Sequence, residues 1–424
     1  MSDGDFKSDL AINEIPLWLN KDYIQSIIGM HSYYNKMNLE VENVDITKCG
    51  GKGENFMSHL YRVAVFYKNH FDESNSDDTD ESKKPFSCII KTSHDDKVPN
   101  FHLSEMETYR NILPKLRMVH PLAKVNNGFF PEVFKIDREN NALILEDLSE
   151  KGYVMADRFK GLDFNHVKLS LEKLALMHAS SMIIQEREPN TFVRSTTGFF
   201  SRENNDGVPI IYSLFDAFCE EMSKCEVYAY YFEKIRKMRT NLIENGRKAF
   251  DVDNNDINVM MHGDFWTNNI MFRYDKNGLP IDAKILDYQF TAYGSPVLDL
   301  LYFIMSSTTE ELREHKMETM MQFYYHQLRK TAEKLNCKKP IPSLHSFYCT
   351  VSKRLNYAFI TCFLLLPVMI DPSRKGDFNL LKGTDEESKA YRKSLFQNYK
   401  YQSIAKAMIP KFDHLGLFND NWHC

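Results

Sequence analysis

The stretch VMMHGDFWTNNIMFRYDKNGLPIDAKILDYQ, residues 259–289, carries the clearest chemical pattern in the chain. It places Asp264 and Asn269 five residues apart in a loop, and Asp287 follows an apolar strand pattern, AKILD. Each of these residue types is common by itself in turns and at strand ends. Together they supply a carboxylate that can orient an attacking hydroxyl and oxygen ligands that suit Mg²⁺. The pattern therefore favours one site that binds a metal ion and a nucleotide.

His262 directly precedes the Gly-Asp pair of this loop. A single histidine at such a position more often fixes a loop through hydrogen bonds to the backbone than transfers protons. We therefore interpret His262 as structural.

Upstream of this stretch, residues 39–148 show strand patterns interrupted by one helix. Tyr61, Val63, Val65 and Tyr67 alternate along one face of a strand,. A short strand FSCIIKT follows, then a helical stretch SEMETYRNILPKL, and then two strand-like runs, GFFPEVFKID and NALILEDL. An amphipathic helix within the first forty residues has the spacing to cap such a sheet.

Two features of this β-rich part can contact phosphates. A glycine cluster, GGKGENF, lies between strand patterns, where backbone N–H groups can approach an anion,. Lys91 ends an apolar strand, and the helix that follows carries Glu105 and Glu107, either of which can form the Lys-Glu pair that presents an ammonium to phosphate,. Each feature alone also suits an ordinary hairpin turn or strand end. It is the order of these features along the chain that indicates a phosphate-binding site.

Beyond Leu148 long helical periodicities dominate, interrupted by a strand-rich island at residues 258–288. Glycine turn, lysine strand, glutamate helix, extended ILED segment, Asp-Asn loop and strand-Asp follow one another as in a two-lobed kinase. We predict an α+β fold with an N-terminal nucleotide-binding lobe at 1–145, a hinge at 146–149 and a helical lobe at 150–424. The acidic segment 72–84 is expected to be a solvated loop.

Composition narrows the function classes. The net charge of −5 disfavours a nucleic-acid binder, and 43% hydrophobic with 26% charged residues is typical of a globular protein,. The eight cysteines are scattered without metal-binding spacing, which favours reduced thiols in an intracellular protein,. The longest apolar run, residues 357–370, is shorter than the roughly 20 residues of a membrane span, so we expect a buried core helix. We expect a cytoplasmic monomer without membrane or nucleic-acid partners.

Five segments together resemble one known family: HGDFWTNNIMF, ILDYQF, GENFMSHLYRV, LILEDL and LALMHASS. They are similar to the ecdysteroid kinase-like (CHK kinase-like) branch of the aminoglycoside phosphotransferase and choline kinase superfamily, from Gly50 to Met305. The resemblance implies a protein kinase-like fold in which Asp264 is the catalytic base, Asn269 and Asp287 hold Mg²⁺, and Lys91 contacts the phosphates of ATP.

The resemblance also implies roles around the nucleotide. Glu105 matches the family's E-x-x-x-Y pattern as the helix partner of the lysine, with Glu107 as its rival, and ILEDL is similar to the hinge that binds adenine. Asp299, in SPVLDLLYF, resembles the acidic residue that braces the catalytic loop. The residues expected to bind ATP are Gly51, Gly53, Asn55, Lys91, Glu105, Glu146 and Leu148.

The acceptor is expected to be a small hydroxylated molecule. ILDYQ in place of D-F-G and HGD in place of H-R-D argue against a protein substrate, and the resemblance implies transfer of phosphate to an alcohol on an ecdysteroid or a hydroxylated xenobiotic. Aromatic and Met residues in the C-terminal helices slightly favour an apolar acceptor pocket, although such residues usually form core. A choline- or aminoglycoside-type kinase, and a retired kinase that only binds a ligand or a partner, are the alternatives.

Overall fold

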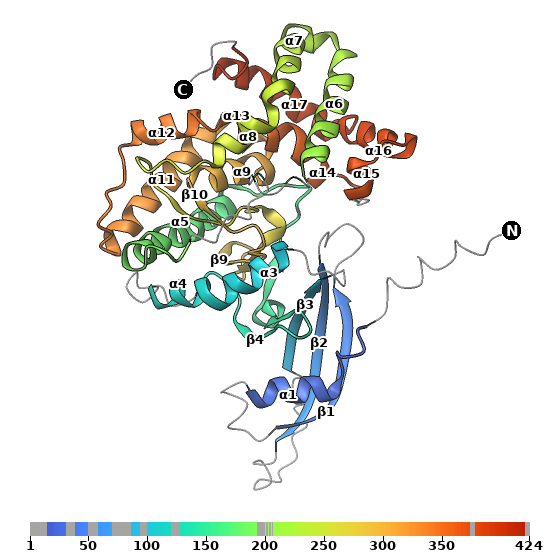
Figure 1. The fold of residues 1–424 in the computed structure, drawn as a ribbon, viewed down its shortest axis with the longest axis vertical. Coiled ribbons are helices and arrows are strands. Elements are labelled where there is room, and N and C mark those ends of the chain that lie inside the picture. The colour runs from blue at the N-terminus through green and yellow to red at the C-terminus, as the bar shows by residue number, and fades with distance from the viewer. Residues whose placement is uncertain are drawn as a thin grey trace, which may run out of the picture. The chain divides into compact units, whose positions relative to one another are not determined.

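The computed structural model describes residues 15–30, 39–49, 58–69, 86–93, 100–119, 128–192, 200, 202, 205, 207–373 and 378–419. The chain divides into two compact units (Figure 1). Unit 1 comprises residues 1–98 and 132–150, and unit 2 comprises residues 99–131 and 151–424. Segment 99–131, which we expected in the N-terminal lobe, thus belongs to unit 2. The chain passes from unit 1 back into unit 2 after Glu150, next to the predicted hinge, and stays in unit 2 from there on.

Unit 1 is built on a five-stranded sheet in the order β1-β2-β3-β5-β4, in which all neighbouring strands are antiparallel. Its strands are β1 (Leu39–Cys49), β2 (Ser58–Asn69), β3 (Phe86–Ser93), β4 (Val133–Asp137) and β5 (Ala142–Glu146). In this register Lys91 on β3 lies opposite Leu60 on one side and Leu143 on the other. The expected strands are therefore confirmed. The acidic segment 72–84 lies outside the described residues.

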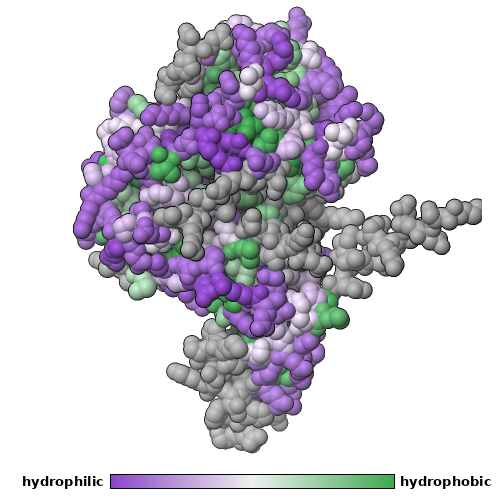
Figure 2. All heavy atoms as spheres, viewed as in Figure 1, coloured by the Kyte–Doolittle hydropathy of each residue, from purple (hydrophilic) through white to green (hydrophobic). Residues whose placement is uncertain are grey.

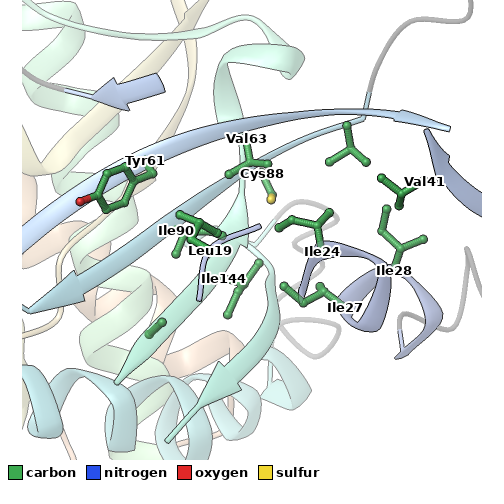
Figure 3. Close-up of a cluster of buried hydrophobic side chains, with 12 residues drawn as sticks. Leu19, Ile24, Ile27, Ile28, Val41, Tyr61, Val63, Cys88, Ile90 and Ile144 are labelled. Atoms are coloured by element: carbon green, nitrogen blue, oxygen red, sulfur yellow. The ribbon is translucent and has the colours of Figure 1, made fainter. Parts of the chain in front are cut away.

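The core of unit 1 lies between one face of the sheet and helix α1 (Lys21–Met30) (Figure 3). Alternation along β2 turns Tyr61, Val63 and Val65 inward, where each is at most 2% exposed,. The helix contributes Ile24, Ile27 and Ile28 at the spacing of one helical face,. The expected amphipathic helix that covers the sheet is thus confirmed.

A polar contact also holds α1 to the sheet. The Tyr23 hydroxyl donates a hydrogen bond to Asp137 Oδ2 at 2.6 Å, and the Lys135 ammonium lies 4.9 Å from the centre of the Tyr23 ring. We expect Tyr23→Phe to lower the free energy of unfolding by about 1–2 kcal/mol, because it removes a hydrogen bond to a carboxylate. Urea denaturation measures this, with Tyr67→Phe as control, since Tyr67 packs against the same core cluster. Equal losses in the two variants would contradict the contribution of the Asp137 contact.

Unit 2 is mainly helical, and its longest helix, α5, packs along α11. Asp163 caps the N-terminus of α5 by accepting the backbone N–H groups of Asn165 and His166,. The longer helices are α3 (Asn100–Glu107), α5 (Phe164–Arg187), α6 (Val208–Ser223), α7 (Ala229–Lys237), α8 (Leu242–Phe250), α9 (Val297–Ser307), α11 (Met317–Lys334), α12 (Leu344–Ser352), α16 (Glu386–Phe396) and α17 (Tyr399–His414). The shorter ones are α4 (Leu113–Val119), α10 (Glu310–His315), α13 (Leu355–Phe359), α14 (Leu366–Met369) and α15 (Phe378–Lys382). The predicted α+β class, with an antiparallel sheet in one part and a larger helical part, is confirmed.

Two small antiparallel sheets form the strand-rich island of unit 2. One has the order β6-β8-β9 and the other pairs β10 with β7. Their strands are β6 (Tyr153–Met155), β7 (Val259–Met261), β8 (Ile270–Tyr274), β9 (Pro280–Ile285) and β10 (Ala292–Gly294). The loop predicted to carry the chemistry, residues 262–269, connects β7 to β8.

The longest apolar run forms the helical stretch from α13 to α14, with a π-helical turn at Ile360–Leu365. Phe359, Cys362 and Phe363 are fully buried there, which confirms a core helix. Among the described helices, none is by itself both long and apolar enough to span a membrane; Leu344–Ser352 and Leu355–Met369, bent by 60°, meet those criteria only as a pair. On the face seen in Figure 2, hydrophilic residues predominate over the helices of unit 2.

Candidate active site

The catalytic-loop candidate begins where β7 ends, and buried hydroxyls fix both of its flanks. The Met260 backbone N–H donates to Ser181 Oγ on α5 (2.9 Å), and the Thr267 backbone N–H donates to Ser307 Oγ at the end of α9 (3.0 Å). The loop is therefore attached to two packed helices of unit 2.

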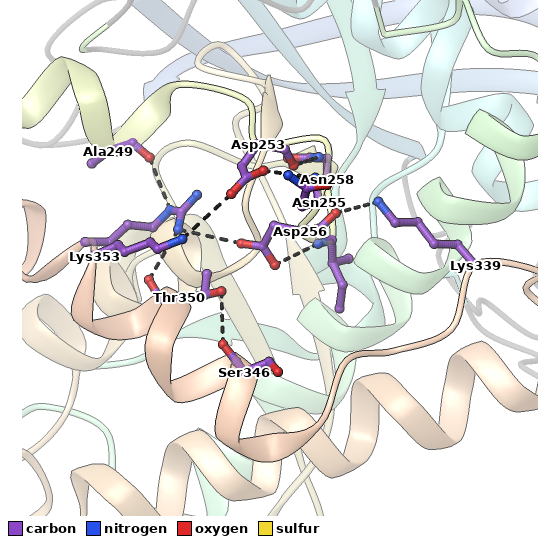
Figure 4. A network of polar contacts seen from close by, with 11 residues as sticks. Ala249, Asp253, Asn255, Asp256, Asn258, Lys339, Ser346, Thr350 and Lys353 are labelled. Atoms are coloured by element: carbon purple, nitrogen blue, oxygen red, sulfur yellow. Dashed lines mark hydrogen bonds and ion pairs between the residues drawn. The ribbon is translucent and has the colours of Figure 1, made fainter. Parts of the chain in front are cut away.

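The segment that leads into β7 is also anchored, by cations from the connections that precede and follow α12 (Figure 4). The Lys339 ammonium donates to the Asp256 carbonyl (2.5 Å), and the Lys353 ammonium lies 3.8 Å from Asp253 Oδ2. The buried Arg354 guanidinium donates to the Ala249 carbonyl (3.2 Å) and lies 3.6 Å from Asp256 Oδ2. These contacts tie the end of α8 and the following loop to α12 and its neighbours.

Asp299, in the first turn of α9, holds the backbone at the start of the loop. Its Oδ2 accepts the His262 N–H (2.6 Å) and its Oδ1 accepts the Gly263 N–H (2.9 Å). Its Oδ2 also accepts from His178 Nε2 (3.1 Å), and the Tyr324 hydroxyl bonds to His178 Nδ1 (2.6 Å). These contacts satisfy a buried carboxylate and confirm the predicted bracing role of Asp299.

The His262 side chain has two partners, both on the backbone. Its Nε2 bonds to the Leu286 carbonyl (2.8 Å), and its Nδ1 accepts the Asp264 backbone N–H (3.2 Å). Because a carbonyl only accepts and a backbone N–H only donates, these partners assign the ring proton to Nε2. The structural role predicted for His262 is confirmed.

The Asp264 carboxylate is held from both sides. The Tyr302 hydroxyl donates to Oδ1 (2.7 Å), and the Asn269 amide nitrogen donates to Oδ2 (2.9 Å) and to the Asp264 carbonyl (2.8 Å). Burial raises the pKa of Asp264, the Tyr302 hydrogen bond lowers it and the charge of Asp287 raises it again, with a net rise. The site thus contains a half-buried carboxylate with a fixed orientation.

Asp287 is brought to this loop by the backbone. Strand β9 ends at Ile285. The next residue, Leu286, donates its backbone N–H to the Asn269 carbonyl (2.8 Å), and Asp287 follows with a left-handed φ of 63°. A non-glycine residue in this conformation is strained, and such residues cluster at functional sites. Because the charge of Asp287 raises the pKa of Asp264 and Asn269 bonds to the Asp264 carboxylate, the three residues lie near one another.

The other predicted site residues are distributed over both units. Lys91 is buried on β3 of unit 1, the Glu146 carboxylate on β5 accepts the Glu132 N–H (3.0 Å), and Leu148 is buried at the start of a 3₁₀ turn. Glu105 belongs to unit 2. Gly51, Gly53 and Asn55 lie outside the described residues.

The structure separates Glu105 from its rival, Glu107. Glu105 is 1% exposed on α3, and its charge raises the pKa of the buried Tyr109 and Tyr288 hydroxyls beyond the rise caused by burial. Glu107 is exposed and accepts a hydrogen bond from the Asn111 amide (2.5 Å). Of the two candidates, Glu105 is therefore the buried one.

Asp147, in the predicted hinge, is fixed within unit 1. Its carboxylate accepts hydrogen bonds from Arg62 Nε (2.7 Å), Ser87 Oγ (2.7 Å) and Ser149 Oγ (2.6 Å). Burial opposes its ionisation, but the hydrogen bonds from Ser149, Ser87 and Arg62 outweigh burial and lower its pKa below 3.8. The segment after β5 is thereby attached to β2 and β3.

This lowered pKa predicts a pH dependence of stability. A carboxyl group whose pKa is lower in the folded than in the unfolded state stabilises the fold above the unfolded value, and the contribution is lost as the pH falls through the folded value. We expect the free energy of unfolding to fall more steeply below about pH 4 in the wild type than in Asp147→Asn. Urea denaturation between neutral pH and pH 3 measures this. Parallel curves for the two proteins would contradict it.

Sequence reasoning missed Tyr302, His178 and Tyr324. His178 lies inside the segment LALMHASS, where a histidine among apolar residues was the available sequence signal. The structure shows that this histidine is fully buried. Tyr302 lies three residues after Asp299, so the two share a face of α9,. This spacing was readable, but the contact with Asp264 was not.

Comparison with known proteins yields distant relatives. The chain is 20% identical over 314 residues to an uncharacterized oxidoreductase of Caenorhabditis elegans; the match covers 69% of this chain and 36% of that protein, so the chain spans about a third of the relative's length. Among solved structures, a Plasmodium vivax ethanolamine kinase is 12% identical, with 94% of this chain and 93% of that chain covered and a TM-score of 0.42. A choline kinase of Cryptosporidium parvum is 13% identical, with 92% and 97% covered and a TM-score of 0.46.

A family model gives the clearest assignment. The model described as the ecdysteroid kinase-like family matches residues 52–337, about two thirds of the chain. The matched segment includes Lys91, the loop with Asp264 and Asn269, Asp287 and the bracing Asp299. The family predicted from the motifs is therefore confirmed: the chain belongs to the ecdysteroid kinase-like family.

Proposed function

We propose that this protein is an ATP-dependent kinase that transfers the γ-phosphate to a hydroxyl of a small molecule, with Asp264 as the catalytic base. The observation that carries the proposal is the Asp264 carboxylate held between Tyr302 and Asn269 on a loop braced by Asp299. Phosphoryl transfer depends mainly on such positioning.

In the proposed step, the acceptor oxygen forms a bond to the γ-phosphorus while the bond from that phosphorus to the β,γ-bridging oxygen breaks, and ADP leaves with the bonding electron pair. The proton of the acceptor hydroxyl passes to an oxygen of Asp264. The net rise in the pKa of Asp264 improves it as a proton acceptor,.

Asn269 and Asp287 are the residues proposed to hold Mg²⁺. The Asn269 nitrogen is occupied by two acceptors on Asp264, so the amide offers its carbonyl oxygen Oδ1 to a cation. An amide oxygen and a carboxylate suit Mg²⁺, which typically takes one or two protein ligands in addition to phosphates. A bound Mg²⁺ would neutralise the charge that develops on the phosphates.

The ATP contacts remain proposals that follow the family pattern. Lys91 would present its ammonium to the phosphates, and the segment from Glu146 to Leu148 would contact adenine. Gly51, Gly53 and Asn55 would supply the phosphate loop.

For the acceptor we propose an ecdysteroid or a similar hydrophobic alcohol, with hormone inactivation or xenobiotic detoxification as the role. Family membership supports this choice. The composition of the C-terminal helices does not, because Met320, Tyr324 and Phe363 are fully buried where helices pack together. These three residues therefore belong to the packed core.

A panel of acceptors tests the substrate class. Ecdysone, 20-hydroxyecdysone, hydroxylated plant aromatics, choline and kanamycin would each be incubated with Mg-ATP, and kcat/KM would be compared. We expect the highest values for the steroids. Higher values for the aromatics would favour detoxification, and preference for choline or kanamycin would replace the hydrophobic acceptor while retaining the kinase.

A further inference from the structure

Helix α9 reaches the catalytic loop through two side chains on one face. Asp299 accepts the backbone N–H groups of His262 and Gly263, and Tyr302, one turn later, donates its hydroxyl to Asp264 Oδ1 at 2.7 Å. One helix thus fixes both the loop backbone and the side chain proposed to act as the base.

The ring of Tyr302 is itself fixed by an aromatic cluster. It stacks on Tyr357 of α13, with ring centres 6.2 Å apart and an interplanar angle of 18°. Phe250 and Phe200 pack edge-on against Tyr357 at 5.2 and 6.0 Å. Such packing restricts the rotamer of Tyr302, so its hydroxyl is pre-positioned.

A carboxylate held by one hydrogen bond can still rotate about its Cβ–Cγ bond, because that torsion is broad. Asn269 fixes Oδ2, and Tyr302 fixes Oδ1 from another element. The two donors together define the carboxylate plane, and therefore the direction of the lone pairs that remain.

We propose that Tyr302 is a positioning residue for phosphoryl transfer, which sets the plane of the Asp264 carboxylate so that the acceptor hydroxyl meets a fixed lone pair. This inference rests on the proposed function. Its effect should appear in the chemical step and not in nucleotide binding, because the Tyr302 hydroxyl contacts the proposed base.

Tyr302→Phe tests this role, because phenylalanine keeps the stacked ring and removes only the hydroxyl. We expect kcat to fall about 10- to 100-fold with KM for ATP unchanged. The matched control is Tyr391→Phe, since the Tyr391 hydroxyl also donates to a buried carboxylate, Asp371 Oδ2, at 3.0 Å. This control should lower thermal stability to a similar extent and leave kcat unchanged.

The outcomes separate this inference from the function on which it rests. Wild-type protein that transfers phosphate to no acceptor would contradict the proposed function and with it the role of Tyr302. Wild-type transfer that persists at full kcat in Tyr302→Phe would contradict the positioning role alone, as would an equal loss of kcat in Tyr391→Phe.

Discussion

Asparagine in place of Asp264 should lower kcat by about 10²- to 10⁴-fold, the usual contribution of a general base. The amide has nearly the same shape as the carboxylate and still offers one oxygen to Tyr302 or Asn269, so the loop should keep its conformation. ATP affinity should be retained or should increase, because a negative charge near the phosphates is removed. Product formation under saturating ATP and acceptor, together with calorimetric titration of Mg-ATP, measures both effects.

Asp275→Asn provides the matched control for this experiment. Asp275 lies in the turn between β8 and β9, where its carboxylate accepts the Asn277 and Leu279 backbone N–H groups. The substitution makes the same change of charge within the same stretch of chain but outside the loop. Activity should be unchanged in this variant. Comparable activity of Asp264→Asn and the wild type would show that Asp264 is not the base.

Alanine in place of Gly263 should cause a large loss in the free energy of unfolding. Gly263 has a φ of 82°, and a Cβ atom built there would collide with the Phe290 carbonyl oxygen. Both the left-handed conformation and the contact with backbone exclude a side chain. We expect a loss of about 4 kcal/mol or more in the free energy of unfolding, or failure to fold, with loss of activity in any folded fraction. Chemical denaturation and a kinase assay on the same preparation measure this.

Gly278→Ala separates the conformational cost from the steric collision. Gly278 has a similar φ of 77°, but a Cβ there has no heavy atom within 4 Å. This variant should lose only about 1–2 kcal/mol, the cost of a left-handed residue with a side chain. Equal losses at the two glycines would mean that close packing against Phe290 does not constrain the loop.

The residues of the site that sequence analysis identified share a local pattern. Asp264 and Asn269 occupy the loop that leads into β8, and Asp287 comes shortly after β9, which pairs with β8. Short spacing and strand periodicity were therefore enough to bring the three residues together. The alternation of Tyr61, Val63 and Val65 likewise specified a half-buried strand. Such features depend on neighbours along the chain.

The residues that were missed depend on distant parts of the chain. Tyr302 contacts Asp264 across 38 residues, and His178 contacts Asp299 across 121. Side-chain type and spacing do not specify which helix packs beside the loop, so these partners could not be inferred. Segment 99–131 belongs to unit 2 for the same reason, since packing and not chain order decides its unit.

In the C-terminal helices, the sequence pattern did not distinguish a ligand pocket from a packed core. Met and aromatic residues at helical spacing indicate a buried face, but the same spacing serves a ligand pocket and a packed core. Here Tyr324 bonds to His178, and Phe363 packs against Phe359 with ring centres 4.9 Å apart. Their role became clear only from these contacts.

The most direct test is transfer of labelled γ-phosphate from Mg-ATP into an organic product, with wild type and Asp264→Asn compared on the same acceptor panel. We predict a labelled phosphate ester of a hydroxylated small molecule with the wild type and essentially none with the variant. Wild-type protein that binds Mg-ATP but labels no acceptor, or label that appears equally with the variant, would contradict a kinase that uses Asp264 as its base.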